Sequence, residues 1–197
     1  MLEPMQLSGQ DVEEGQTPCL DRRGFLKLAA CALGAVAASP ALGRTVGNKD
    51  RMLSLYSPRT GETVRTVYWA PRIGYIGESL KEVSWALRDH RNDQYKLFDP
   101  KLLDQLYALQ RLMDPRQPMH IISGYRSPAT NAMLRQHNRR VAKNSYHIRA
   151  MATDIRMPGH STKKLHRAAL SLNGGGVGYY SRSDFVHIDT GPVRTWG

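Results

Sequence analysis

Two histidines and one aspartate in the C-terminal half of the chain have the residue types and spacing of a catalytic metal site. His147 and Asp154 stand seven residues apart, and His187 follows His147 after forty residues. Two imidazoles and one carboxylate, with water as the fourth ligand, form the open tetrahedral site of a catalytic zinc ion. The open position lets such an ion activate its water and polarise a carbonyl group. The pattern therefore predicts a hydrolytic Zn²⁺ site.

The three candidate ligands differ in how strongly each one alone indicates a metal. His147 ends a predicted loop and Asp154 lies in a predicted strand, where each also fits an ordinary surface residue or hydrogen-bonded polar group. His187 lies in a late strand, Phe-Val-His-Ile-Asp, among apolar neighbours, where an unpaired polar ring is costly. The ring needs a partner, and a metal ion is one.

The elements that must position these residues mix strands and helices. Polar and apolar residues alternate on both sides of a Ser-Pro-Arg-Thr-Gly turn, which predicts a β-hairpin. Asp99-Pro100 and Ser127-Pro128 each supply a helix N-cap followed by proline in the first turn. The order of elements predicts one small α+β domain. The expected strands are 52–56, 63–69, 119–122, 151–157, 177–180 and 185–190, and the expected helices are 78–90, 99–114, 127–140 and 161–172, with a loop at 74–77 and a flexible glycine turn at 174–176.

The charge balance of the chain is strongly basic. The 197 residues carry a formal net charge of +11. A basic surface implies an anionic partner, for which nucleic acid, anionic lipid and acidic wall polymer all qualify. Residues 1–43 contain more acidic than basic side chains, so their removal would leave a still more basic remainder. The positive charge therefore belongs to the working domain.

The first 43 residues are typical of a twin-arginine export signal. Asp-Arg-Arg-Gly-Phe-Leu-Lys at 21–27 precedes an apolar run at 28–38 and small residues around Pro40. The apolar run is too short to span a bilayer. We expect cleavage near Ala41 or Gly43, which leaves residues 44–197 as a monomeric zinc peptidase domain in the periplasm, where nucleic acid is no longer an expected partner.

Two other interpretations of this segment fit its residues less well. An ordinary amphipathic helix would need a recurring polar face, which the run lacks. Leu-Ala-Ala-Cys at 28–31 resembles a lipoprotein cleavage box, but cleavage there would leave almost no apolar core before the cut. Both cysteines, Cys19 and Cys31, precede residue 44, so the remainder offers neither a disulfide nor a thiolate ligand.

The segments around the candidate ligands resemble the murein endopeptidase K family. The resemblance rests on Ser-Gly-Tyr-Arg-Ser at 123–127, Ser-x-His-x-x-Ala-x-Ala-x-Asp at 145–154, Gly-Gly-Val-Gly-Tyr-Tyr at 175–180 and Phe-Val-His-Ile-Asp-Thr-Gly at 185–191. That family is grouped with the D-alanyl-D-alanine carboxypeptidases and the hedgehog zinc domain. The resemblance implies a central antiparallel sheet flanked by helices, one zinc ion, and hydrolysis of cross-links between peptidoglycan peptide stems. The residues leave both D,D and L,D cross-links open, and the resemblance favours the L,D kind.

The resemblance also assigns roles to individual residues. His147, Asp154 and His187 match the metal ligands. Arg126 matches an arginine that stabilises the polarised carbonyl oxygen, a role that suits a permanently charged guanidinium, although a surface arginine is the alternative.

The chain departs from the wider group at two places. Ala150 stands where glycine is usual, and alanine is strained there if the position needs a positive φ. A carboxylate or histidine that serves as general base is usual shortly before the last ligand, but here Phe185 lies two residues before His187. Residues at even offsets on a strand share a face, so we prefer Asp189 as base or as the carboxylate that orients an imidazole, with Asp184 as the alternative.

Three further residues are expected to contact the substrate: Ser123, Tyr125 and Tyr146. Aromatic residues at strand ends also fit a core. The missing base motivates a second hypothesis, a catalytically impaired zinc-containing module that binds peptidoglycan. A third hypothesis, binding to anionic lipid, would show no dependence on a chelator.

Overall fold

The computed structural model describes residues 49–139 and 141–197. The predicted export signal at 1–43, with its cysteines and cleavage points, lies outside these residues and stays a prediction. The described residues belong to one compact unit. No helix within the described ranges has the length and apolar character that crossing a bilayer requires.

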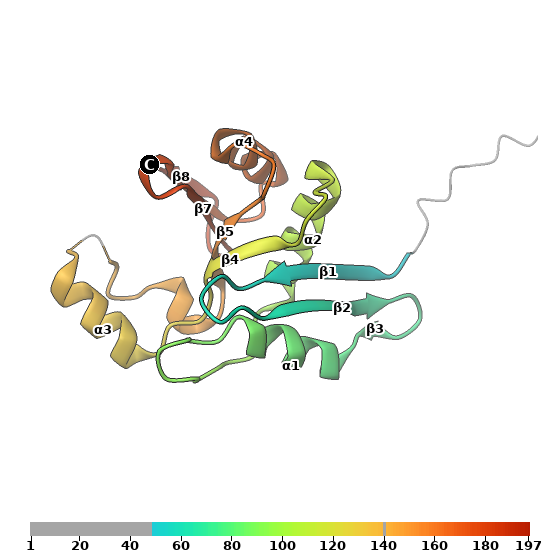
Figure 1. Ribbon diagram of the computed structural model, residues 1–197, viewed down its shortest axis with the longest axis horizontal. Coiled ribbons are helices and arrows are strands. Elements are labelled where there is room, and N and C mark those ends of the chain that lie inside the picture. Colours follow the sequence, from blue (N-terminus) through green and yellow to red (C-terminus); the bar gives the residue numbers. More distant parts are fainter. Residues whose placement is uncertain (1–48, 140) are drawn as a thin grey trace, which may run out of the picture. The chain divides into compact units, whose positions relative to one another are not determined.

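One eight-stranded sheet runs through this unit (Figure 1). Along the sheet the order is β3-β2-β1-β4-β5-β7-β6-β8. Most neighbours are antiparallel, but β1 is parallel to β4, and β6 is parallel to β8. Between β1 and β4 the chain forms two more strands and two helices, which together make the crossover that a parallel pair requires. The strands are β1 (Arg51–Tyr56), β2 (Thr63–Ala70), β3 (Gly74–Tyr75), β4 (Met119–Ser123), β5 (Ala152–Arg156), β6 (Gly176–Tyr180), β7 (Phe185–Asp189) and β8 (Arg194–Trp196).

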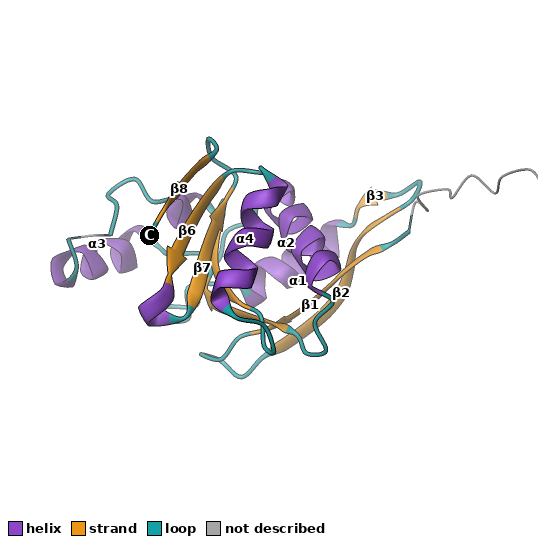
Figure 2. Ribbon diagram, turned by 90° about the horizontal axis from the view of Figure 1, so that it is seen from above, coloured by secondary structure: helices purple, strands orange, loops and turns teal. Residues whose placement is uncertain are grey.

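The helices confirm the predicted α+β class and the predicted caps. The Asp99 carboxylate accepts a hydrogen bond from the Lys101 amide, and the Ser127 hydroxyl accepts one from the Thr130 amide. Helices α2 and α4 lie side by side against the sheet (Figure 2), with buried leucines between them and the strands. The helices are α1 (Gly77–Ala86), α2 (Pro100–Met113), α3 (Pro128–His137) and α4 (Thr162–Leu172), with short 3-10 turns η1 (Tyr146–Arg149) and η2 (Ser181–Ser183).

Some boundaries differ from the sequence predictions. Helix α1 ends at Ala86 instead of residue 90, because the carbonyl of Leu87 accepts a hydrogen bond from the Tyr125 amide at 2.7 Å and the chain then turns around the buried Asp89. Helix α3 ends at His137, where the next residue is extended. The expected loop at 74–77 contains the short strand β3, and β8 was not predicted.

One row of side-chain positions crosses five strands and carries the candidate site. Ser123 on β4 pairs with Asp154 on β5, which pairs with His187 on β7. His187 pairs with Gly178 on β6, and Gly178 with Trp196 on β8. Directly paired residues point to the same face of a sheet. The alternate residues of β5 and β7 lie in the hydrophobic core, so this row occupies the opposite face.

Candidate metal centre

Three ligand atoms from two strands and one turn converge in the interior. His147 Nε2 lies 3.2 Å from His187 Nδ1 and 3.3 Å from Asp154 Oδ1. His187 Nδ1 lies 2.9 Å from the same carboxylate oxygen. All three residues are buried. Asp154 and His187 are placed by the β5–β7 register, and His147 is placed by η1.

The hydrogen bond made by the outer nitrogen of each imidazole shows which ring nitrogen carries the proton. His147 Nδ1 lies 2.7 Å from the carbonyl oxygen of Gly124, and His187 Nε2 lies 3.0 Å from Asp189 Oδ2. A carbonyl and a carboxylate only accept hydrogen bonds, so both outer nitrogens are the protonated donors. In the neutral rings the inner nitrogens therefore present lone pairs, and Asp154 adds a third acceptor. Three acceptors that face one another in a buried site need a cation between them.

The distances fit one small divalent ion. Zinc binds imidazole nitrogen and carboxylate oxygen at about 2.0–2.2 Å in a tetrahedron, which separates neighbouring ligand atoms by roughly 3.3 Å. The observed separations of 2.9–3.3 Å lie close to this value. Among the described residues this is also the group of three or more His, Cys, Asp or Glu side chains that meets the requirements of a shared ion.

Burial and charge shift the pKa values of the three ligands in different directions. Burial alone would raise the pKa of Asp154, but the imidazoles of His147 and His187 outweigh burial and lower it. Burial lowers the pKa of His147. Burial also opposes the charge on His187, but hydrogen bonds to Asp154 and Asp189 raise its pKa. Without a metal, His187 is therefore the ligand that takes up a proton.

The turn that carries His147 contains a strained residue. The Ser145 hydroxyl accepts a hydrogen bond from the His147 amide, which starts η1. Ala150 ends the turn at φ 53° and is fully buried. The position does adopt the left-handed conformation, which costs an alanine about 1 kcal/mol or more. The fold tolerates this strain where it directs His147 toward the other ligands.

Arg126 contacts the outer oxygen of the carboxylate ligand. Its Nη2 donates to Asp154 Oδ2 at 2.8 Å, and its Nε donates to the Ser123 hydroxyl at 3.1 Å. The guanidinium therefore fixes the orientation of Asp154 and also borders the cavity beside it. Ser123, expected to contact substrate, instead supports Arg126, and Tyr125 packs against the hydrophobic core.

Asp189 lies behind His187 and is surrounded by donors. Its buried carboxylate accepts hydrogen bonds from the amides of Gly176 and Gly191 and from both terminal nitrogens of Arg194. Burial alone would raise the pKa of Asp189, but His187, Arg194 and these amides lower it. A carboxylate held in this way orients the His187 ring. Asp189 does not line the cavity, so its geometry favours the orienting role over the role of base.

Asp184, the alternative base, is not brought to the site. It follows η2 at φ 52°, and its carboxylate contacts Arg156 Nε at 2.9 Å and the Thr162 hydroxyl. Its side chain is exposed and does not line the cavity next to His187. Arg156, which pairs with His120 on β4, also donates through Nε to the Asp184 carbonyl and so holds this residue from a second side.

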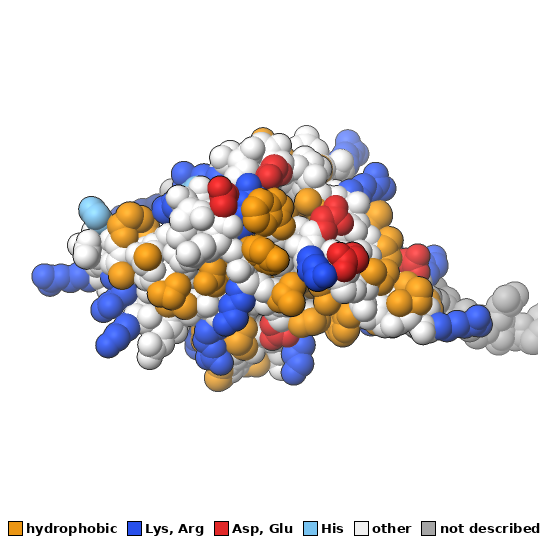
Figure 3. All heavy atoms as spheres, turned by 90° about the horizontal axis from the view of Figure 1, so that it is seen from below, with side chains coloured by type: hydrophobic (Ala, Val, Ile, Leu, Met, Phe, Trp, Pro, Cys, Tyr) orange, Lys and Arg blue, Asp and Glu red, His pale blue; other side chains and the backbone are white. Residues whose placement is uncertain are grey.

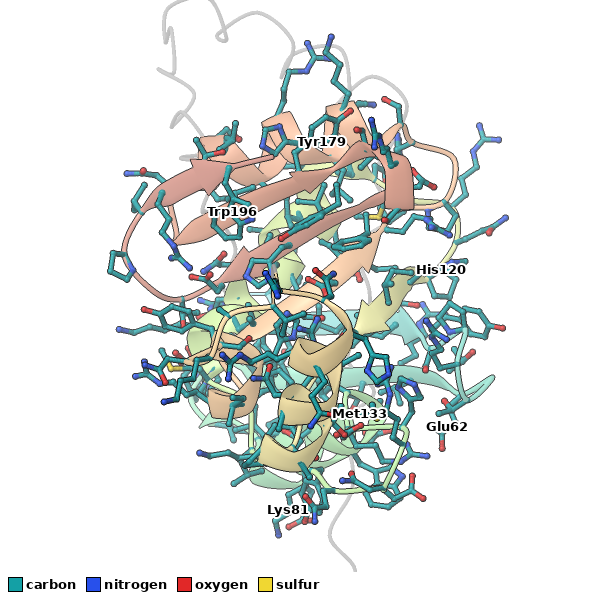
Figure 4. All side chains as sticks on the ribbon, turned by 90° about the vertical axis from the view of Figure 1, so that its left-hand side faces the viewer. Glu62, Lys81, His120, Met133, Tyr179 and Trp196 are labelled. Carbon is teal, nitrogen blue, oxygen red and sulfur yellow. The ribbon has the colours of Figure 1, made fainter. Side chains whose placement is uncertain are left out.

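A cavity of about 480 Å³ opens over the three ligands. One wall comes from Tyr146 and the segment before it. Contact between Tyr146 and a substrate stays a prediction. The C-terminal part of the lining contains Tyr180, Arg194 and Trp196. Arg194 lies 5.1 Å over the Tyr146 ring, and the Trp196 indole lies 5.2 Å from the His187 ring. Trp196 also donates to the Tyr180 hydroxyl, and Figure 4 labels it on β8. Sequence reasoning missed this part of the lining, because the only signal was the aromatic and basic composition of the last residues.

Comparison with known proteins gives consistent matches. A family model described as peptidoglycan L,D-endopeptidase MepK matches residues 45–196. Peptidoglycan L,D-endopeptidase MepK of Escherichia coli (strain K12) is 45% identical over 177 residues, which cover 89% of this chain and 97% of the relative. A probable peptidoglycan L,D-endopeptidase MepK of Haemophilus influenzae is 39% identical over 178 residues, which cover 89% of this chain and 95% of the relative. No solved structure matches the chain.

Proposed function

The chain belongs to the peptidoglycan L,D-endopeptidase MepK family of peptidases, and on this premise we propose that it is a zinc-dependent endopeptidase that hydrolyses L,D cross-links between peptidoglycan stems. Membership confirms the resemblance inferred from the motifs around His147 and His187. The observation that carries the proposal is the convergence of three buried acceptors, His147 Nε2, His187 Nδ1 and Asp154 Oδ1, within 3.3 Å of one another.

The protein's own residues suit amide hydrolysis at this point. When bound, a zinc ion supplies a Lewis acid and an activated water. Arg126 borders the same cavity, and two of its nitrogens are committed to Asp154 and Ser123. We assign its remaining terminal nitrogen to the carbonyl oxygen of the scissile amide, where a fixed positive charge stabilises the developing negative charge. Tyr146 and Trp196 provide walls against which a peptide stem packs.

Asp189 is assigned a positioning role. Its hydrogen bond to His187 Nε2 keeps Nδ1 directed at the other ligands. We do not assign Asp184 a role in the reaction, since its carboxylate contacts Arg156 and Thr162. Among the described residues that line the cavity, Asp154 provides the carboxylate.

The place of action follows from the substrate. Hydrolysis of peptidoglycan requires a location outside the cytoplasm, and we propose that the twin-arginine segment at 21–27 directs export to the periplasm. The family match begins at residue 45, which supports a boundary near Ala41 or Gly43. Sequencing the N-terminus of the protein recovered from the periplasm tests this point, and an N-terminus at residue 1 would contradict it.

The test of the proposed function measures metal content and wall digestion together. The purified protein should contain about one zinc per chain and release soluble muropeptides from sacculi, and mass spectrometry should identify the new ends as products of L,D cleavage. A chelator should stop the release, and added zinc should restore it. Under the same conditions His147→Ala should bind no zinc and release nothing.

The same experiment separates the other hypotheses. A wall-binding module would bind sacculi and retain zinc but release no muropeptides. A lipid-binding protein would show no response to the chelator. The complete set of ligands and orienting partners favours the enzyme over the impaired module, because each buried imidazole already has the outer hydrogen bond that a working ligand needs.

A further inference from the structure

One wall of the cavity carries a group of exposed basic side chains. The segment between α3 and η1 lines the cavity through Val141, Ala142, Asn144 and Ser145. Basic residues of the same segment and its flanks are exposed, and we call them the basic rim: Arg135, Arg139, Lys143 and Arg149. Figure 4 looks onto this wall, with α3 and its Met133 in front of the strands.

The basic rim lies in a part of the chain without acidic residues. No Asp or Glu occurs between Asp114 and Asp154. Each of the three later acidic residues contacts an arginine. Asp154 contacts Arg126, Asp184 contacts Arg156, and Asp189 contacts Arg194. At the end of the molecule that carries α3, Figure 3 shows Lys, Arg and His side chains but no acidic ones on the visible face. The local field on this side of the cavity is therefore positive.

Neighbouring elements do not neutralise the rim. Two acidic residues, Asp89 and Asp93, lie in the loop after α1, and Asp89 contacts the start of α3. Asp89 is buried and accepts from the Ser127 amide, and Asp93 pairs with Arg88. Arg149 lies 5.1 Å over the ring of Tyr146, which borders the cavity. Through Arg149 the rim reaches the border of the cavity, and its four cations make no ion pair within the described part of the chain.

We propose that the basic rim binds the free carboxylates of peptidoglycan stems that flank the cross-link in the cavity. The inference rests on the proposed function and adds the feature that holds the enzyme on the polymer. One exposed ion pair contributes little, but a polymer presents many carboxylates, and several weak contacts close to one another raise the local concentration of cross-links. The rim therefore strengthens binding to the intact wall and contributes much less to binding of a small soluble fragment.

Two triple variants of the full chain test this proposal. The first is Arg135→Gln with Arg139→Gln and Lys143→Gln, which leaves the cavity lining unchanged. The matched control is Lys163→Gln with Lys164→Gln and Arg167→Gln on the exposed side of α4, away from the cavity. Both remove three positive charges from exposed positions of a helix or its flank. Zinc content, sacculus binding at increasing salt, and cleavage of sacculi and of a short soluble cross-linked dimer are measured for each.

The rim variant should require about fivefold more sacculi for half-maximal rate. Its sacculus binding should depend less on salt, while its maximal rate, zinc content and dimer cleavage should change less than twofold. The α4 variant should match the unmodified protein. Equal losses in both variants would reduce the effect to net charge and overturn the proposal, as would unchanged sacculus binding. Loss of binding to phosphatidylglycerol vesicles with unchanged sacculus binding would assign the rim to lipid instead. Failure of the proposed function is recognised separately, as absence of zinc and cleavage in the unmodified protein.

Discussion

Two clusters in this molecule each place polar groups around one aspartate, but they have opposite hydrogen-bonding character. At the edge of the sheet, Asp104 of α2 accepts from Arg51 Nη1 at 2.7 Å and from the hydroxyls of Tyr68 and Tyr75 at 2.8 and 2.7 Å. Burial and then the hydrogen bond to Asp104 raise the pKa of Tyr68, so its hydroxyl stays a donor. Every group that faces Asp104 brings a proton, and the cluster is complete.

At the metal centre the groups that face Asp154 Oδ1 are acceptors. The protons of His147 and His187 are directed outward, to the Gly124 carbonyl and to Asp189. Judged by residue type alone, the charged and polar side chains around Asp104 are as suitable for a functional site as those around Asp154. The direction of the donors, more than the presence of charged side chains, therefore distinguishes a structural cluster from a metal site.

The largest effect is expected from Asp154→Asn, which removes one acceptor charge from the metal centre. Zinc content should fall to background and sacculus digestion with it, because an amide is a poor zinc ligand and leaves Arg126 without its carboxylate partner. Elemental analysis and muropeptide release measure the result. Retention of one zinc per chain would contradict the assignment of Asp154.

The second-largest effect is expected at Arg194, which holds the Asp189 carboxylate that orients the His187 ring. Arg194→Gln removes two hydrogen bonds from Asp189, so His187 loses part of its restraint. Zinc affinity should fall by about ten- to a hundredfold, as measured by competition with a chelator. Arg194→Lys should recover part of the loss, since it restores the charge. Equal affinity in all three proteins would show that Asp189 is fixed by the backbone alone.

A smaller and graded effect is expected from pH. Because the pKa of His187 is raised in the metal-free protein and the pKa of Asp154 is lowered, acidification protonates His187 first. Zinc must displace that proton, so its apparent affinity should fall by up to about tenfold per pH unit below the raised pKa and level off above it. Calorimetry in buffers of different ionisation enthalpy should detect close to one proton released on the acidic side. Affinity that does not vary with pH would contradict this.

The smallest functional effect is expected from the matched change at the other cluster. Asp104→Asn weakens the bonds from Arg51 and the two tyrosines and should lower the free energy of unfolding by about 1–3 kcal/mol. Zinc content and digestion should stay at the unmodified level when measured well below the unfolding temperature. Loss of zinc here would remove the distinction between the two clusters.

The sequence predicted much of the fold and singled out the three residues that converge, because the relevant signals are local. The caps at Asp99 and Ser127 depend on neighbouring residues, and the alternation around His187 correctly placed Asp189 on the same face of β7. The motifs around His147, Asp154 and His187 then identified these three residues as one candidate group. Whether these three bind zinc stays a prediction.

The remaining features depend on contacts between distant segments. Arg194 and Trp196 reach the site because the three-residue strand β8 pairs parallel to β6, and so short a strand has no periodicity to detect. The orienting geometry of Asp189 arises from Gly176 and Arg194, which no local pattern connects. No local pattern marks Asp104 on α2, since its partners come from three separate strands.

The direct pairing of Asp154 with His187 across β5 and β7 has a consequence for how the proposed ion would enter and leave the protein. Two of the three ligands are neighbours within the hydrogen-bonded ladder, so a stripped protein retains their spacing for as long as the sheet persists. In small zinc fingers, by contrast, the chain unfolds when its metal is removed. A protein built in this way can lose its ion to a competing chelator and take up another one repeatedly, and it repeats no folding step when it does so.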